Sequence, residues 1–326
     1  MKVLVTGGAG FIGSHVAGLL LEHGHQVFVA DDLSSGREEN LPQGAVFYKL
    51  DIRTQEFTDK MLDLRPDAIA HLAAQVDVRK SVADPVLDAD INVLGTIRVI
   101  RSAMQAGTKK ILFSSTGGAI YGEQDAFPAT EEHPRRPVSP YGTSKLCAEE
   151  YLAYFRRDNG PAYAVLRYAN VYGPRQDPHG EAGVVAIFIK KMLAGQTPVI
   201  NGDGRQTRDF VFVRDVARSN LLALESDAEG VFNIGTGKET EINTLTSVLI
   251  SATGFTGSRL HGPPAPGEQR RSCVDPSLAK KVLGWHPEVE LKSGLEETVA
   301  HSQRSPHFHL SDNSYTLARP ARWRNR

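Results

Sequence analysis

The feature that most constrains the fold stands at the N-terminus. There Thr6-Gly7-Gly8-Ala9-Gly10-Phe11-Ile12-Gly13 joins a strand-like run to an amphipathic helical stretch. In such a unit Gly7 permits a tight turn, Gly10 lets the backbone approach a pyrophosphate, and Gly13 lets the helix pack closely on the strand. The free N–H groups and positive dipole end of the helix then face the phosphates. The strand before and the helix after this triplet indicate a dinucleotide-binding unit.

Short β-branched runs and helical stretches alternate through the first half of the chain. This alternation predicts an α/β fold, a Rossmann-type doubly wound parallel sheet. We expect strands at residues 2–6, 26–30, 46–50, 68–72, 110–113 and 163–167, and helices at 11–23, 85–106 and 139–158.

The pattern loosens after about Asn170, where Gly and Pro become denser. Helices are expected at 184–194, 216–225, 242–252 and 294–302. We predict a nucleotide-binding Rossmann domain at 1–170 and a smaller C-terminal α/β substrate lobe at 171–304, with a strand near 231–234 returning to the main sheet. Residues 305–326 lack apolar periodicity and are rich in arginine, which predicts a disordered basic tail.

Composition narrows the class of protein. The 326 residues carry a net charge of -1, so no overall field attracts nucleic acid. No apolar run approaches a membrane span of about 18 residues, and the chain opens directly into a strand, which argues against a signal peptide. Cys147 and Cys273 allow one disulfide, but free thiols in a reducing cytoplasm are the expected state. Three histidines near the C-terminus, His301, His307 and His309, are taken as chance, so no metal is expected.

An acidic residue follows the second expected strand. Asp31 lies 18 residues beyond Gly13, where its carboxylate can accept hydrogen bonds from the adenosine ribose hydroxyls. The same charge repels a 2′-phosphate. NAD is therefore favoured over NADP, although the nearby Arg37 argues the opposite case.

A second motif, Tyr141-Gly142-Thr143-Ser144-Lys145, pairs a tyrosine with a lysine on one helix face. A free tyrosine has a pKa near ~10, too high for a general base at neutral pH. A neighbouring ammonium favours the phenolate and lowers that pKa. The pair therefore predicts proton transfer by Tyr141, assisted by Lys145.

Together these residues resemble the extended short-chain dehydrogenase/reductase family over about residues 1–302. The motifs that carry the resemblance are Thr6–Gly13, Asp31–Leu33, Asp51-Ile52, His71–Ala74, Asn92–Thr96, Ser114–Thr116, Tyr141–Lys145 and Arg208–Val211. The chain is most similar to the NAD-dependent nucleotide-sugar epimerases. The resemblance implies interconversion of UDP-glucose and UDP-galactose through a 4-keto intermediate with tightly bound NAD.

The resemblance also implies roles at the cofactor. Backbone at Phe11 and Ile12 would contact the pyrophosphate, and Tyr141 and Lys145 would also touch the nicotinamide ribose. The remaining expected cofactor residues are Asp31, Asp32 and Ser35 at the adenosine ribose, Asp51 and Ile52 at the adenine, Leu72, Ala73 and Ala74 along the cofactor's path, Asn92 and Ser114 in support, and Tyr168 beside the nicotinamide.

The segment after Ser114 separates subclasses. Thr116 would hydrogen-bond the sugar 4-hydroxyl, from which Tyr141 takes the proton. Sugar 4,6-dehydratases of this family carry an Asp-Glu pair directly after the threonine, because elimination needs a further acid and base. Here Gly117 and Gly118 occupy the two positions of that Asp-Glu pair. A nucleotide-sugar decarboxylase of this family also usually has an acid there, so the two glycines argue against both activities.

The resemblance places the nucleotide in the second lobe. Asn170 and Arg208 would contact the diphosphate, Ile200 the uracil, and Glu268 the ribose. Ala265 stands where many epimerases have an arginine, and Arg270 is the candidate replacement. Val76 stands where some have a lysine, so Gln75 or Arg79 would replace that sugar contact.

Ser272 stands where a tyrosine restricts the pocket in enzymes confined to UDP-glucose and UDP-galactose. A small residue there implies some turnover of UDP-N-acetylglucosamine. A 4-epimerase of that sugar, or of UDP-glucuronate with Arg79 or Arg175 facing its carboxylate, therefore remains open. The sequence also leaves open whether the nucleotide carries uridine or thymidine, since an apolar contact differs little between the two bases.

Two further readings are a net nucleotide-sugar oxidoreductase or decarboxylase and a non-catalytic NAD-binding protein. The second could lose Tyr141, Lys145 or Thr116 without penalty, yet all three are present. The resemblance also implies a homodimer, paired through the helices at 85–106 and 139–158.

Overall fold

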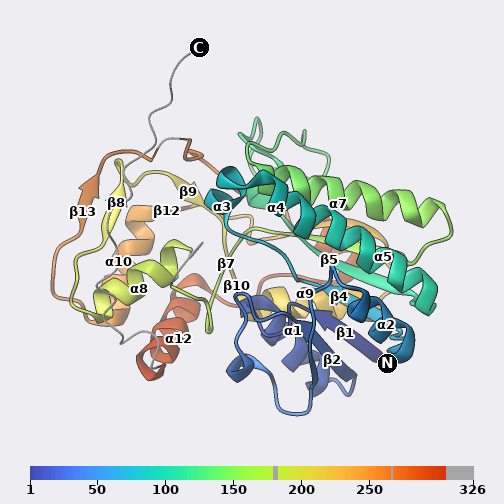
Figure 1. Cartoon of the computed structure of the whole chain (residues 1–326). Coiled ribbons are helices and arrows are strands. Elements are labelled where there is room, and N and C mark those ends of the chain that lie inside the picture. The colour runs from blue at the N-terminus through green and yellow to red at the C-terminus, as the bar shows by residue number, and fades with distance from the viewer. Residues whose placement is uncertain (179–182, 266, 306–326) are drawn as a thin grey trace.

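The computed structural model describes residues 1–178, 183–265 and 267–305. Among these, seven parallel strands form one sheet in the order β11-β6-β5-β4-β1-β2-β3 (Figure 1). The order reverses at β1, as in a doubly wound fold, and the predicted fold class is confirmed. The strands are β1 (Lys2–Thr6), β2 (Gln26–Asp31), β3 (Val46–Lys49), β4 (Ala68–His71), β5 (Lys110–Thr116), β6 (Ala162–Tyr168) and β11 (Gly230–Ile234).

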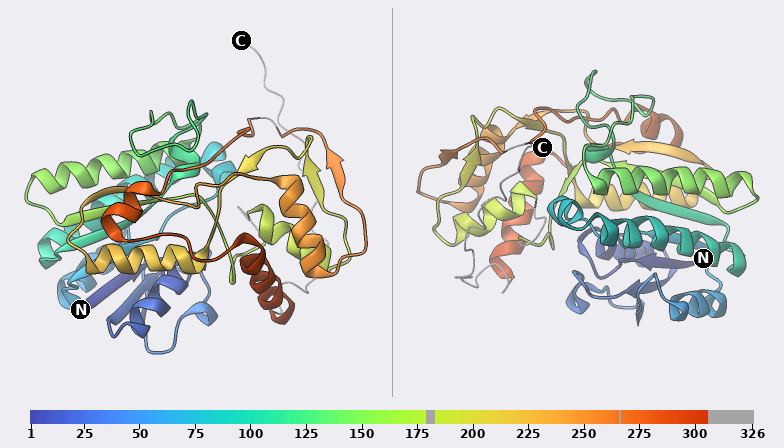
Figure 2. Two further views of the ribbon diagram at one scale, coloured as in Figure 1. Left: turned by 180° about the vertical axis from the view of Figure 1, so that it is seen from behind. Right: turned by 45° about the horizontal axis from the view of Figure 1, so that its top comes forward.

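Two apolar cores cover the two faces of the sheet, because successive residues of a strand point to opposite sides. On β1, Val3 and Val5 join one core and Leu4 joins the other. The first core holds α1 (Phe11–Glu22), α9 (Val213–Glu225) and α11 (Ser277–Leu283). The second holds α2 (Gln55–Leu64), α5 (Gly95–Ala106) and α7 (Pro140–Arg157). Figure 2 shows α9 and α7 on opposite sides of the sheet.

The smaller lobe has its own core. It is built by α8 (Val184–Leu193), α10 (Ile242–Thr253) and α12 (Leu291–Arg304), which gather beside the large sheet in Figure 1. Short strands connect them: β7 (Asn170–Tyr172) with β10 (Phe210–Phe212), β8 (Val199–Asn201) with β13 (Leu260–Gly262), and β9 (Thr207–Arg208) with β12 (Thr240–Glu241).

More of the second half returns to the sheet than the strand near 231–234. That strand is β11, which pairs in parallel with β6. Helix α9 packs on α1, and the indole Nε1 of buried Trp285 donates to the carbonyl of Asp215 at 2.8 Å. Helix α9 and Trp285 therefore belong to the core of the large sheet as well.

The helix expected at 85–106 is three consecutive segments. They are α4 (Pro85–Ala89), a π-helical turn η2 (Asp90–Leu94) and α5. Asn92 lies in η2, and its side chain bonds both backbone groups of Gln75. Remaining short helices are η1 (Glu38–Asn40), α3 (Val78–Ala83) and α6 (Gly117–Ile120).

In the part of the chain that the structure describes, no helix is long and apolar enough to cross a membrane. The predicted basic tail lies outside the described residues from 306 onward, and so do His307 and His309.

Candidate active site

A cleft of about 1210 Å³ opens at the carboxyl ends of the strands. This is where open parallel sheets bind ligands. Its wall includes most of the residues predicted to meet a cofactor: Gly7, Gly10, Phe11, Ile12, Gly13, Asp31, Asp32, Ser35, Asp51, Ile52, Leu72, Ala73, Ala74, Ser114, Tyr141, Lys145 and Tyr168. Asn92 does not line the cleft; it is buried behind the wall.

The glycine turn forms a cradle that side chains would fill. Gly7 has φ 70°, and a Cβ there would lie 2.6 Å from the backbone nitrogen of Ala73. A Cβ on Gly13 would collide with the carbonyl oxygen of Gly7. Gly10 precedes α1 and caps no N–H group, so the first amides of that helix stay available to an anion. This geometry fits the diphosphate of a dinucleotide.

Asp31 ends β2 with its side chain fixed by the backbone. Its two carboxylate oxygens accept the N–H groups of Ala9 at 3.0 Å and Leu33 at 2.9 Å. Burial raises the pKa of Asp31, and these two hydrogen bonds oppose that rise. An anchored carboxylate at this position suits the hydroxyls of a ribose.

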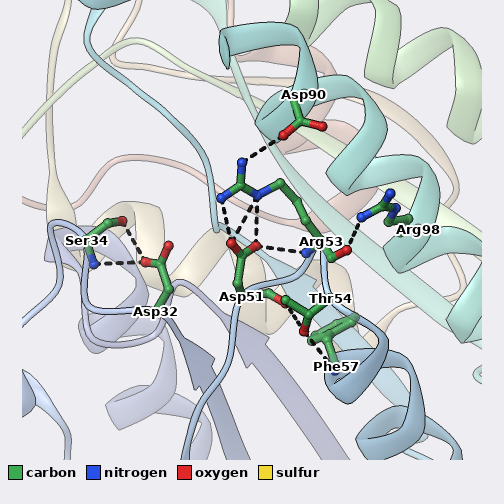
Figure 3. A network of polar contacts seen from close by, with 8 residues as sticks. All are labelled: Asp32, Ser34, Asp51, Arg53, Thr54, Phe57, Asp90 and Arg98. Atoms are coloured by element: carbon green, nitrogen blue, oxygen red, sulfur yellow. Dashed lines mark hydrogen bonds and ion pairs between the residues drawn. The ribbon is translucent and has the colours of Figure 1, made fainter.

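At the predicted adenine end of the cleft, Asp51 is bound by Arg53, a residue for which no role was predicted. Its guanidinium lies between the carboxylates of Asp51 at 2.6 Å and Asp90 at 2.8 Å (Figure 3). The hydrogen bond from Arg53 holds the pKa of Asp51 below its usual range. Arg53 therefore ties the loop after β3 to the π-helical turn.

Tyr141 and Lys145 lie on the first turns of α7. The helix begins after Ser139, whose Oγ accepts the N–H of Gly142 at 3.1 Å, with Pro140 in the first turn. The Nζ of Lys145 lies 6.0 Å from the ring centroid of Tyr141 and donates to the carbonyl of Ser114 at 3.0 Å. Burial lowers the pKa of Lys145 to about 8.

Thr116 and Tyr168 complete this end of the cleft. The Oγ1 of Thr116 accepts the N–H of Ala119 at 3.2 Å and so caps α6. The hydroxyl of Tyr168 contacts Ser114 Oγ at 3.0 Å and accepts from Asn220 Nδ2 at 2.8 Å. Burial raises the pKa of Tyr168 to about 12, so this phenol stays protonated.

A buried histidine fixes the loop after β4. The two ring nitrogens of His71 contact Thr6 Oγ1 at 2.7 Å and Thr96 Oγ1 at 3.0 Å. The same Thr6 Oγ1 accepts the N–H of Ala73 at 3.2 Å. Burial lowers the pKa of His71 to about 3, so the ring is neutral. The His-Leu-Ala-Ala motif thus holds Ala73 against the glycine turn through hydroxyl groups.

Most of the residues predicted to bind the nucleotide sugar do not gather at the large cleft as the predicted cofactor residues do. Arg208 Nη2 lies 3.6 Å from Glu268 Oε1, and burial lowers the pKa of Arg208. Ile200 is buried in the small lobe's core, and Ser272 is also buried. None of these four, nor Asn170, lies among the described residues that line the large cleft. Asn170 is exposed, and its N–H donates to the carbonyl of Asp209.

Two proposed substitutes have other partners. Arg270 forms a two-pronged, exposed ion pair with Asp203 at 2.8 and 3.0 Å. Gln75 lines the cleft, but its amide N–H groups donate to the carbonyl of Asp77 and the carboxylate of Asp88, each at 3.0 Å. Both side chains therefore already have hydrogen-bond partners within the protein.

Comparison with known proteins identifies the family. The profile of the NAD dependent epimerase/dehydratase family matches residues 3–235. This chain belongs to that family. It is 45% identical to the UDP-glucose 4-epimerase of Mycolicibacterium smegmatis over 305 residues, 92% of this chain and 97% of the relative.

Solved structures agree with this membership. The UDP-glucose 4-epimerase of Thermotoga maritima, solved with UDP-glucose, is 50% identical, with a TM-score of 0.91 over 93% of this chain and 99% of that one. The enzyme of Thermus thermophilus, solved with NAD, is 43% identical, with a TM-score of 0.88 over 94% and 100%.

The family unites epimerases and dehydratases, so the residues after Thr116 matter. A Cβ on Gly118 would meet only Thr116 Oγ1, at 3.9 Å, whereas one on Gly117 would lie 2.7 Å from the side chain of Val274. Space for a larger residue thus exists at Gly118, but the chain carries no acid there.

Several basic side chains that line the cleft were not predicted to do so: Arg53, Lys80, His301 and Arg304. Arg175, considered only for a sugar carboxylate, lies beside them and donates to Ser14 Oγ at 3.2 Å. His301 and Arg304 come from α12, nearly the full chain length from the glycine turn, and no local pattern could reveal that they lie together.

Proposed function

We propose that this chain is a UDP-glucose 4-epimerase that interconverts UDP-glucose and UDP-galactose with retained NAD. The observation that carries this proposal is one arrangement. Tyr141, Lys145 and Thr116 line the cleft that fits the cofactor, and the two following positions are Gly117 and Gly118. A site with a proton acceptor and no acid at the two positions after Thr116 suits oxidation and reduction at one carbon, and it does not suit elimination of water.

In the proposed reaction Tyr141 takes the proton of the sugar 4-hydroxyl, and Thr116 orients that hydroxyl. Lys145 stabilises the phenolate by its charge. When bound, NAD supplies the acceptor and later the donor of the C4 hydride. The 4-keto sugar then turns in the pocket, and Tyr141 returns the proton after hydride reaches the other face.

We assign the nucleotide to the smaller lobe. Arg208 would bind the diphosphate, since its guanidinium suits phosphate oxygens. Glu268, 3.6 Å from Arg208 in the protein alone, would turn to the uridine ribose. Ile200 lies in the small lobe's core, so its proposed contact with uracil requires one face of that core to open.

The test is conversion of UDP-galactose to UDP-glucose by purified protein with no NAD added. Turnover is expected, because a redox-neutral cycle regenerates its own cofactor. A turnover that requires added NAD and accumulates an oxidised sugar would instead establish a net oxidoreductase. Absence of turnover with NAD still present after denaturation would indicate another sugar.

A second substrate is favoured by Ser272. This small, buried side chain stands at the predicted sugar end, and Arg270, two residues before it, pairs with Asp203. We therefore include UDP-N-acetylglucosamine in the proposed range.

We also propose a homodimer. Helices α4 and α7 and the π-helical turn carry apolar side chains toward solvent: Val86, Leu94, Tyr151 and Tyr154 are 78%, 49%, 36% and 54% exposed. A second copy that pairs these helices would cover them. Sedimentation equilibrium tests this: a mass of about twice the 35.5 kDa chain is expected.

The proposed location is the cytoplasm. Both cysteines, Cys147 and Cys273, are free, which suits a reducing compartment. Fractionation of the producing cell, with detection by antibody, tests the location.

A further inference from the structure

Asp88, which the proposed mechanism does not use, is a fully buried carboxylate on α4. One oxygen accepts the Ser144 hydroxyl at 2.6 Å. The other accepts the side-chain amides of Gln75 and Asn92, each at 3.0 Å. No cation pairs with it among the described residues. Buried carboxylates are usually paired with a cation, so this one calls for an electrostatic explanation.

Lys145, next to Ser144 in sequence, is a buried cation on which the charge of Asp88 acts. Charged groups act on its ammonium from several elements. Asp88 on α4 contributes most to keeping it charged, Glu149 on α7 contributes less, and burial works against both. His71 on β4 is neutral, and Ser114 on β5 offers only its carbonyl.

The charge of Glu149 is paired with a cation. Arg167 binds both of its carboxylate oxygens, at 2.6 Å through Nη2 and 3.0 Å through Nε, and both side chains are buried. The positive charge of Arg167 therefore opposes the negative charge of Glu149. Asp88 is thus the acid near Lys145 whose charge no described cation neutralises.

We propose that Asp88 is a positioning residue that keeps Lys145 as an ammonium ion beside Tyr141. It does so by its uncompensated charge and by anchoring Ser144, so that the lysine stays in register on α7. This inference rests on the proposed function, since that function assigns proton transfer to Tyr141 and Lys145.

The same carboxylate anchors the segment that holds the other member of the pair. Through Gln75, whose Oε1 accepts the N–H of Asp77 at 2.7 Å, Asp88 fixes the start of α3. Ser81 on α3 then accepts the backbone N–H of Tyr141 at 3.2 Å. Both ends of the Tyr141–Lys145 pair therefore attach to one buried acid.

The test is the pH dependence of kcat of the holoenzyme with Asp88→Asn. The amide has nearly the same shape and can still bond its three neighbours, so the change removes charge. We expect the basic limb of the profile to move about one pH unit lower, because Lys145 loses its proton more easily. Ser144→Ala, which removes the anchoring hydrogen bond and no charge, is the matched control: it should lower kcat through the looser register of Lys145 but leave that limb in place. A folded Asp88→Asn enzyme with an unmoved basic limb would overturn the proposal.

A second measurement needs no variant of Asp88. In wild-type protein labelled with ¹³C at aspartate carboxyls, the Asp88 resonance should show an inflection near pH 8 as Lys145 titrates, and Lys145→Met should abolish it. A flat Asp88 resonance across that range contradicts the inference. This readout uses no substrate, so its failure is separate from a failure of the epimerase assignment.

Discussion

The Nζ of Lys145 donates to the carbonyl oxygen of Ser114 at 3.0 Å. This bond joins the helix that carries Tyr141 to the strand that ends in Thr116. The proposed base, its charged neighbour and the residue that orients the sugar are therefore held together by the backbone of β5.

Replacing Tyr141 by Phe should lower kcat by roughly 10² to 10⁴, the usual share of general acid–base catalysis. NAD should remain bound, because the glycine turn and Asp31 are untouched. Steady-state assays measure kcat, and cofactor absorbance after denaturation measures the bound NAD. Near-normal turnover by this variant would refute the scheme.

Lys145 makes stability depend on pH in a calculable direction. Its folded pKa of about 8 lies below the unfolded value of 10.5, so burial of the charged form destabilises the fold below pH 8. Lys145→Met should then be more stable than wild type by up to about 3 kcal/mol at pH 7. The gap should shrink as the pH rises from 8 to 10.5. Urea unfolding of cofactor-free proteins at several pH values checks this.

His71 predicts acid lability. Its folded pKa of about 3 lies below the unfolded 6.5, so between these values the unfolded chain binds more protons. The free energy of unfolding should fall by roughly 2–3 kcal/mol from this group between pH 6.5 and 4.5. His71→Asn should flatten that part of the curve, whereas His23→Asn, an exposed control, should not.

Arg208 and Arg270 are rival candidates for the diphosphate. Arg208→Met should raise KM for UDP-glucose roughly 10- to 100-fold, as expected for loss of hydrogen bonds to a charged group. Arg270 already pairs with Asp203 on the surface, so Arg270→Met should change KM little. Steady-state kinetics of the two variants decides between them, and the reverse order would transfer the contact to Arg270.

Ser272→Tyr should abolish turnover of UDP-N-acetylglucosamine while the rate with UDP-galactose stays within about threefold. The tyrosine ring would occupy the space that the acetamido group needs. Coupled assays with both substrates measure the ratio. A wild-type protein that turns over UDP-galactose but never the N-acetyl sugar would contradict this account of Ser272.

The parts of the fold that local pattern determines were predictable. The bounds of Lys2–Thr6 agree with those predicted, because its apolar residues Val3–Val5 stand just before a glycine turn. The helix expected at 139–158 forms at Pro140–Arg157, where Ser139 caps and Pro140 fits the first turn. Both signals lie within a few residues of the element that they predict.

Long-range relations were not predictable in the same way. The π-helical turn at Asp90–Leu94 has no local breaker, and its side chain Asn92 is bound by Gln75, 17 residues away. Nothing near Arg53 in the sequence distinguishes it from other arginines, because its role depends on Asp90, which only the fold brings close. Burial of Asp88 likewise depends on three segments that meet only in the folded chain.

The return of the chain to the large sheet also governs how the protein can be made. A ribosome that has released residues 1–170 has not yet delivered α9, β11 or Trp285, so one core of the sheet lacks its cover. A fragment ending there should be captured by chaperones or precipitate. Cotranslational completion of the nucleotide-binding half must wait until about residue 285 has left the exit tunnel, by which time most of the smaller lobe has been synthesised as well.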